Sequence, residues 1–197
     1  MDRMSRTAFA VAVAYAIPKT RSLKMSSATQ TIDVLVNVDA DYLLAYPNDV
    51  GGAISMLVTR DAVDPNASGN TGEGGDELWI DVKPGDNIRW RATTLSRNFD
   101  RIALIKNVQS GDPHQGGDYK GTMSTPLTYN IPGVVPYLNK AANGGISKTD
   151  VIYSMWQATA ENPGKLWYQI TFVLLDRDLN QLGPQHTWDP YITVNNQ

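Results

Sequence analysis

The strongest pattern in the chain is an alternation of apolar and polar positions in TIDVLVNVDADY, residues 31–42. Isoleucine and valine occupy one parity, and the other parity carries Asp33, Asn37, Asp39 and Asp41. Successive side chains of a strand point to opposite faces of a sheet. The segment is therefore predicted to be a strand with one apolar face and one face that carries three carboxylates.

Seven further segments have the alternation, residue types or flanking turn residues of strands. With the first, the predicted strands are residues 32–39, 53–59, 78–83, 87–94, 101–108, 151–159, 166–175 and 191–194. The turn KPGD, residues 83–86, separates two of them, and its proline and glycine favour a tight chain reversal. We therefore expect residues 78–83 and 87–94 to form a β-hairpin.

Two other segments refine the fold class. LWYQITFVLL, residues 166–175, is apolar on both parities, which is typical of a central strand covered on both faces. VPYLNKAANGG, residues 135–145, predicts one short helix closed by Gly144. The pattern as a whole predicts an all-β protein. We expect an antiparallel β-sandwich of the jelly-roll or Greek-key type, with long loops and at most one short helix.

The beginning of the chain differs from the rest. Arg3 and Arg6 precede an apolar run of about ten residues, which is too short to span a bilayer, and Ala14-Tyr15-Ala16 resembles a signal-cleavage site. We expect residues 1–30 to be an N-terminal extension, either disordered or signal-like, and residues 31–197 to form the β-sandwich domain. Export remains open if residues 1–16 act as a signal.

Composition removes several classes of function. The chain has 197 residues, a net charge of -3 and no cysteine. Without cysteine there is no disulfide, thiol nucleophile, thiolate zinc site or iron–sulfur cluster. The acidic balance gives no indication of a nucleic-acid partner. The serine-hydrolase and zinc-protease signatures are also missing, and two histidines are the total available for any triad.

Two loops have the residue types of a sugar site. SGDPHQGGDYKG, residues 110–121, brings carboxylates, a histidine and an aromatic together, and WDP, residues 188–190, precedes the last strand. Carboxylates accept hydrogen bonds from vicinal hydroxyls, and an aromatic ring covers the apolar face of a sugar. A solvated loop and a packed tryptophan are the structural alternatives. The candidate ligand-binding residues are Asp112, His114, Asp118, Tyr119, Trp188 and Asp189.

A weak calcium site is possible in DRDLNQLG, residues 176–183. Asp176, Asp178 and Asn180 have the spacing that opens an EF-hand loop. The sixth and twelfth positions are Gln181 and Thr187, where that loop has glycine and glutamate. A polar turn after a core strand is the alternative. We predict no other cofactor.

Asp39 and Asp41 raise a catalytic alternative. On one face of a strand their carboxylates would lie roughly 6–7 Å apart, twice the rise per residue. Such a separation suits acid/base catalysis by a glycosidase. The competing interpretations are an exposed strand end and carboxylates that cap loop amides.

The two ends of the domain together resemble the bacterial AidA/PixA inclusion-body protein family. IDVLVNVDADYL, residues 32–43, and WDPYITV, residues 188–194, match its terminal motifs, and the segments at 79–96 and 102–108 are compatible with it. The resemblance implies an abundant protein under quorum-sensing control, in cytoplasmic inclusions of host-associated bacteria. It further implies lectin-like binding of sugars such as fucose, and no enzymatic activity. Six methionines are few for a storage inclusion.

We therefore expect a non-enzymatic protein that forms homo-oligomers and binds saccharides or host glycans in a lectin-like manner. A purely structural inclusion protein without ligand and a glycosidase that uses Asp39 or Asp41 remain alternatives. Neither nucleic acid nor a membrane-spanning segment is expected.

Overall fold

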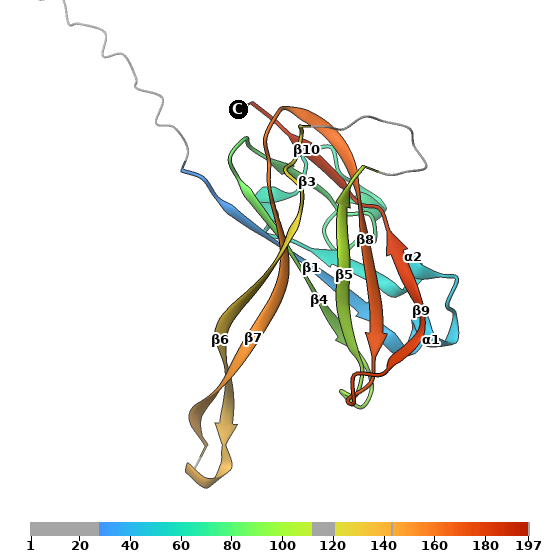
Figure 1. Ribbon diagram of the computed structural model, residues 1–197, viewed down its shortest axis with the longest axis vertical. Coiled ribbons are helices and arrows are strands. Elements are labelled where there is room, and N and C mark those ends of the chain that lie inside the picture. Colours follow the sequence, from blue (N-terminus) through green and yellow to red (C-terminus); the bar gives the residue numbers. More distant parts are fainter. Residues whose placement is uncertain (1–27, 112–120, 143, 197) are drawn as a thin grey trace, which may run out of the picture.

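The computed structural model describes residues 28–111, 121–142 and 144–196 (Figure 1). The predicted extension, residues 1–30, lies almost entirely outside this part of the chain. The elements in chain order are β1 (Thr31–Asp39), α1 (Ala40–Ala45), α2 (Val50–Ala53), β2 (Ile54–Leu57), η1 (Arg60–Ala62), η2 (Gly69–Thr71), β3 (Trp79–Val82), β4 (Asn87–Leu95), β5 (Ile102–Ser110), β6 (Leu127–Asn139), η3 (Lys140–Ala142), β7 (Gly145–Thr159), β8 (Gly164–Leu175), β9 (Gln181–Trp188) and β10 (Tyr191–Val194).

These strands form two sheets, and the predicted all-β sandwich is confirmed. One sheet has the order β2-β1-β4-β7-β6, and the other has the order β3-β10-β8-β5, with β9 also paired to β8. Most pairs are antiparallel. Two pairs, β1 with β4 and β3 with β10, are parallel.

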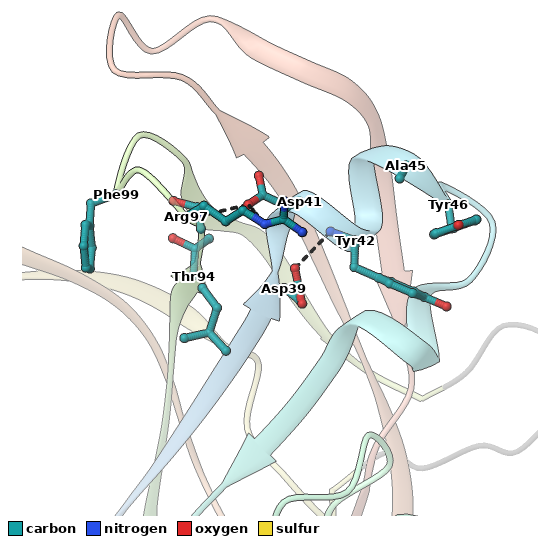
Figure 2. A pocket seen from close by; sticks show the side chains of 10 residues that line it. Asp39, Asp41, Tyr42, Ala45, Tyr46, Thr94, Arg97 and Phe99 are labelled. Carbon is teal, nitrogen blue, oxygen red and sulfur yellow. Dashed lines mark hydrogen bonds and ion pairs between the residues drawn. The ribbon is translucent and has the colours of Figure 1, made fainter.

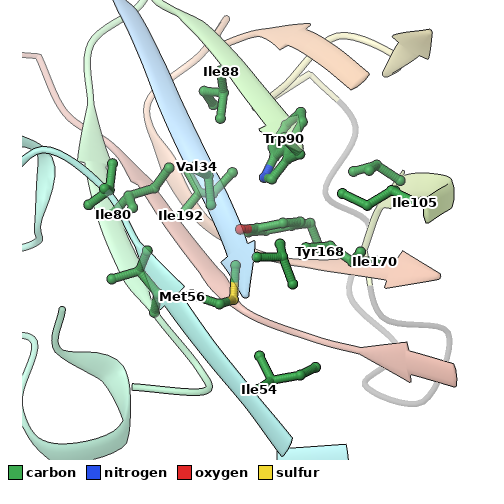
Figure 3. Packing of buried hydrophobic residues seen from close by; sticks show 14 of the residues in the cluster. Val34, Ile54, Met56, Ile80, Ile88, Trp90, Ile105, Tyr168, Ile170 and Ile192 are labelled. Atoms are coloured by element: carbon green, nitrogen blue, oxygen red, sulfur yellow. The ribbon is translucent and has the colours of Figure 1, made fainter. Parts of the chain in front are cut away.

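The core lies between the sheets and contains the apolar face of β1 as predicted. Ile32, Val34 and Val36 are buried there. Trp90 of β4 and Tyr168 of β8 meet from opposite sheets, with ring centroids 5.3 Å apart (Figure 3). The central strand prediction also holds, because β8 is hydrogen-bonded on both sides and most of its residues are buried.

The predicted hairpin between residues 78–83 and 87–94 is wrong. The turn itself forms, since the N–H of Asp86 donates to the carbonyl of Lys83 at 3.0 Å and Gly85 has φ +95°. However, β3 belongs to one sheet and β4 to the other. The buried carboxylate of Asp86 accepts the N–H groups of Gln30 and Lys83 and fixes this crossing. Turn residues indicate a reversal of the chain, and they do not say which strand becomes the neighbour.

The helix prediction is also wrong. Residues 135–139 belong to β6, and a single 3₁₀ turn, Lys140–Ala142, precedes Gly144. Proline and β-branched residues favour the extended chain here. The two short α-helices occur elsewhere, at α1 and α2, where Asp39 and Asp49 accept backbone N–H groups as N-caps. The limit of one short helix is therefore corrected to two.

Strands β6 and β9 were not predicted. β6 and β7 form a long hairpin that projects from the sandwich (Figure 1), and β4 pairs with β7 at residues 156–159 alone. Within the described residues, no helix is long and apolar enough to cross a membrane.

Candidate functional site

An open cleft of about 510 Å³ lies between α1 and the turn that joins β4 to β5 (Figure 2). Its size falls in the range of small-molecule sites. The lining combines carboxylates, a guanidinium group and aromatic rings. The lining residues are Asp39, Asp41, Tyr42, Ala45, Tyr46, Thr94, Leu95, Ser96, Arg97 and Phe99.

One wall of the cleft is α1, which begins directly after β1 because Asp39, the last residue of the strand, is the N-cap of the helix. The carboxylate of Asp39 accepts the N–H of Tyr42 at 2.9 Å, which satisfies a donor that the first helical turn leaves free. The parity of β1 ends here, so Asp41 belongs to the first turn of α1 instead of the strand face. The predicted row of three carboxylates on one strand face is therefore broken, and Asp33 remains exposed on β1.

The opposite wall is tied to α1 through Asp41. Its carboxylate accepts the backbone N–H of Arg97 at 3.0 Å, and the Arg97 Nε lies 4.0 Å from it. Arg177 of the β8–β9 turn donates to the carbonyl of Asn98 at 3.1 Å and supports the same turn from outside. Both sides of the cleft are thus held by contacts between segments far apart in the sequence.

Aromatic rings stand at the two ends of the labelled group in Figure 2. Tyr42 and Tyr46 pack with ring centroids 4.9 Å apart, and Phe99 lies on the far side of the Asp41–Arg97 pair. The Tyr42 hydroxyl donates to the carboxylate of Asp49 at 2.5 Å. This hydrogen bond raises the pKa of Tyr42 and lowers the pKa of Asp49.

Phe99 is the most unusual residue of the cleft. It is 92% exposed, although it is a large apolar side chain, and its φ is +52°. Bulky residues rarely adopt positive φ, because the Cβ crowds the backbone. Both the exposure and the conformation oppose stability, which is a common property of ligand-contact residues.

The cleft can bind a small polar ligand that has an apolar face. Arg97 is 92% exposed in its side chain and can donate hydrogen bonds, while Asp41 retains acceptor capacity beyond its bond to the Arg97 amide. Phe99 and the tyrosine pair offer ring surfaces for stacking. The two carboxylates weighed for glycosidase chemistry are both here, and each accepts a backbone N–H that holds α1 or its neighbouring turn.

Of the sequence-predicted sugar residues, the two that the structure describes, Trp188 and Asp189, do not line this cleft. Asp112, His114, Asp118 and Tyr119 lie outside the described residues. Trp188 is part of the packing: its Nε1 donates to the carbonyl of Asp76 at 2.6 Å.

Asp189 lies at the corner between β9 and β10, where the local charge is negative. Burial, and then the nearby carboxylates of Asp76 and Asp189, raise the pKa of Glu77. This corner contributes no residue to the lining of the cleft beside α1.

The candidate calcium residues form the turn between β8 and β9. The Asp176 carboxylate accepts the N–H groups of Asp178 and Asn180, both at 2.9 Å, and the Asn180 side-chain amide at 3.0 Å. The hydrogen bond from the Asn180 side chain lowers the pKa of Asp176 most strongly. Across the described part of the chain, no group of three or more His, Asp or Glu residues could hold a metal ion.

Sequence reasoning missed Tyr42, Tyr46, Arg97 and Phe99 as site residues. One signal was present for Phe99, because a large aromatic residue is out of place in the polar turn SRNFD, residues 96–100. The contact of Asp41 with Arg97 spans 56 residues and leaves no local pattern.

Comparisons with known proteins identify one family. The sequence model of the PixA family, described as inclusion body protein, matches residues 30–194. The crystal structure of the PixA inclusion body protein from Burkholderia cenocepacia J2315 has a TM-score of 0.65 and 20% identity, covering 88% of this chain and 100% of that one. The solution structure of amebosin has a TM-score of 0.23 and 15% identity, covering 61% of this chain and 90% of that one. No curated protein sequence matches this chain.

Proposed function

Because this chain belongs to the PixA inclusion body protein family, we propose that it is a non-enzymatic, self-associating protein that binds a saccharide in the cleft beside α1. The observation that carries the saccharide proposal is the combination of carboxylates, an exposed guanidinium group and exposed aromatic rings around one cavity of about 510 Å³. The observation that supports self-association is the family itself, together with the exposed apolar residues of the β6–β7 hairpin.

Each element of the cleft has a role in saccharide binding. Arg97 donates to ring or hydroxyl oxygens, and Asp41 accepts from hydroxyl groups. Phe99 stacks on the apolar face of the pyranose ring. The proposed activity is lectin-like, with fucose as one ligand. None of these binding roles requires a catalytic group.

The test is a glycan array with the purified full chain, run once with calcium and once with EDTA. Selective binding that Phe99→Ala and Arg97→Ala both weaken supports the cleft as the binding site. Loss of binding in EDTA would indicate that a calcium ion bridges the protein and the saccharide. Selective binding that both variants leave unchanged would place the ligand at another surface.

A purely structural inclusion protein is the second candidate. It is favoured by the hairpin, whose exposed apolar residues suit assembly and not the recognition of a polar ligand. This candidate predicts a blank array and assembly that depends on concentration, with no response to added sugars.

The glycosidase alternative is the weakest of the three. Asp39 and Asp41 each accept a backbone N–H within the fold, which gives both carboxylates a structural role. Turnover of a glycoside that Asp39→Asn or Asp41→Asn abolishes would establish it.

For the biological setting, we propose storage in cytoplasmic inclusions of a host-associated bacterium, with expression under quorum-sensing control. Export is the alternative if residues 1–16 act as a signal. Detection of the protein in inclusions of dense cultures, and its absence from the culture medium, would separate the two.

A further inference from the structure

The hairpin of β6 and β7 exposes apolar residues that no other layer of the described chain covers. We define the arm as β6 together with residues 145–155 of β7. It extends beyond the part of β7 that pairs with β4 (Figure 1). Nine of the 17 exposed large hydrophobic residues in the described chain lie on it: Leu127, Tyr129, Val134, Val135, Tyr137, Leu138, Ile146, Ile152 and Tyr153.

The register of the arm separates two different faces. Residues directly opposite each other in an antiparallel pair share a face, so the odd-numbered residues of both strands lie together. We call this the outer arm face. Its large apolar residues are Leu127, Tyr129, Ile131, Val135, Tyr137, Val151, Tyr153 and Met155.

No charged residue lies on the outer arm face. Its remaining positions are glycine, serine, threonine and asparagine, whereas Lys148 and Asp150 lie on the opposite face. The opposite face is the one that continues toward the core, because Trp156 has its parity and donates from Nε1 to the carbonyl of Ile105 in the other sheet. Where the arm leaves the sandwich, the outer arm face therefore points away from the core.

We propose that the outer arm face packs against the outer arm face of a second copy of this chain, as the contact behind the self-association proposed above. An uncharged apolar face is self-complementary, since two copies bury it without stranding a charge. A two-stranded ribbon of this kind is marginal in water alone and needs a packed face. Thirteen residues give a contact about 43 Å long at about 3.3 Å per residue.

The edge of the arm argues for packing face to face instead of strand addition. β6 is the last strand of its sheet and carries Pro132 and Pro136. A proline tolerated beside β7 has its nitrogen directed away from that strand, where it offers no N–H to an incoming strand. The free edge is thus blocked at two positions, and the apolar face remains for the partner.

Tyr137→Lys tests the proposal, with Leu138→Lys as its matched control. The two residues are neighbours in β6, are exposed by 50% and 73%, and lie on opposite faces. Sedimentation of the full chain over a range of concentrations should show association that Tyr137→Lys weakens roughly tenfold or more. Leu138→Lys should associate as the wild type does.

A second measurement uses the absence of cysteine from the chain. Single cysteines placed in turn along residues 129–138 should give cross-linked dimers with a short bismaleimide at odd positions and not at even ones. Equal cross-linking at both parities, or association unaffected by Tyr137→Lys, overturns the arm contact and leaves self-association standing. A wild type that stays monomeric at every concentration overturns both. A monomer that instead binds neutral phospholipid vesicles assigns the face to lipid and also overturns the proposal.

Discussion

The ring of Tyr153 lies over the backbone of Gly133, in the space that a Cβ at position 133 would occupy. The two residues are diagonal neighbours across β6 and β7, and the Tyr153 hydroxyl donates to the carbonyl of Val134 at 3.2 Å. An aromatic ring over a glycine restores the cross-strand contact that glycine cannot make. Glycine usually weakens a strand, but here its missing side chain leaves the space that the Tyr153 ring occupies.

Gly133→Ala should therefore destabilise the arm by about 1 kcal/mol, although alanine is the better strand residue. Hydrogen exchange of the β6 and β7 amides would measure the loss. In a Tyr153→Ala background the same change should be neutral or stabilising, because the ring is gone. Additive effects of the two substitutions would contradict the packing described.

Asp39 should behave as a helix cap and not as a catalytic acid. Asp39→Ala should lower the free energy of unfolding by about 1 kcal/mol, since it leaves the N–H of Tyr42 without its acceptor. Asp39→Asn should cost a few tenths of that, because asparagine caps equally well. Urea unfolding measures both. Asp33→Ala, at an exposed position of β1, is the control and should have little effect.

His186 should make the fold less stable in mild acid. It is buried on β9 beside Phe172, and burial lowers its pKa. The unfolded chain, with an ordinary pKa of about 6.5, then binds the proton more readily than the folded chain. The contribution of neutral His186 to the free energy of unfolding is fully present above about pH 6.5. It is lost as the pH falls from there through the lower pKa of the folded state.

The measurement is the free energy of unfolding at pH 7.5 and at pH 5.5. His186→Gln should lose less stability between these values than the wild type does. The lowered pKa values of Asp49 and Asp176 act at more acidic pH and leave this window unaffected. An equal loss in both proteins would contradict the assignment to His186.

The sequence predicts local structure well where one face of a strand is buried. The alternation that includes Ile32 and Val34 predicted β1 with its buried face. The apolar run of residues 166–175 predicted β8 as a central strand. The pairing of strands was harder to predict from the sequence. The KPGD turn can reverse the chain within a hairpin or in a crossing between two sheets, and its residues are the same in both cases. The cleft was the feature hardest to predict from the sequence, since contacts such as that of Arg97 with Asp41 depend on the whole topology.

Phe99 has a φ of +52° and is 92% exposed, and both properties work against stability. Phe99→Gly should raise the free energy of unfolding by about 0.5–1 kcal/mol, because glycine adopts positive φ without crowding. Phe99→Ala retains the crowded Cβ and should gain nothing. Both variants should lose saccharide binding, since both remove the ring.

Leu179 provides the matched control for this prediction. It also has a positive φ, +64°, and is 68% exposed, but it does not line the cleft. Leu179→Gly should gain stability in the same way and bind saccharide as the wild type does. Thermal unfolding and glycan binding on the same samples separate the two effects. A stabilised Phe99→Gly that still binds saccharide would mean that the strain at position 99 serves something other than this ligand.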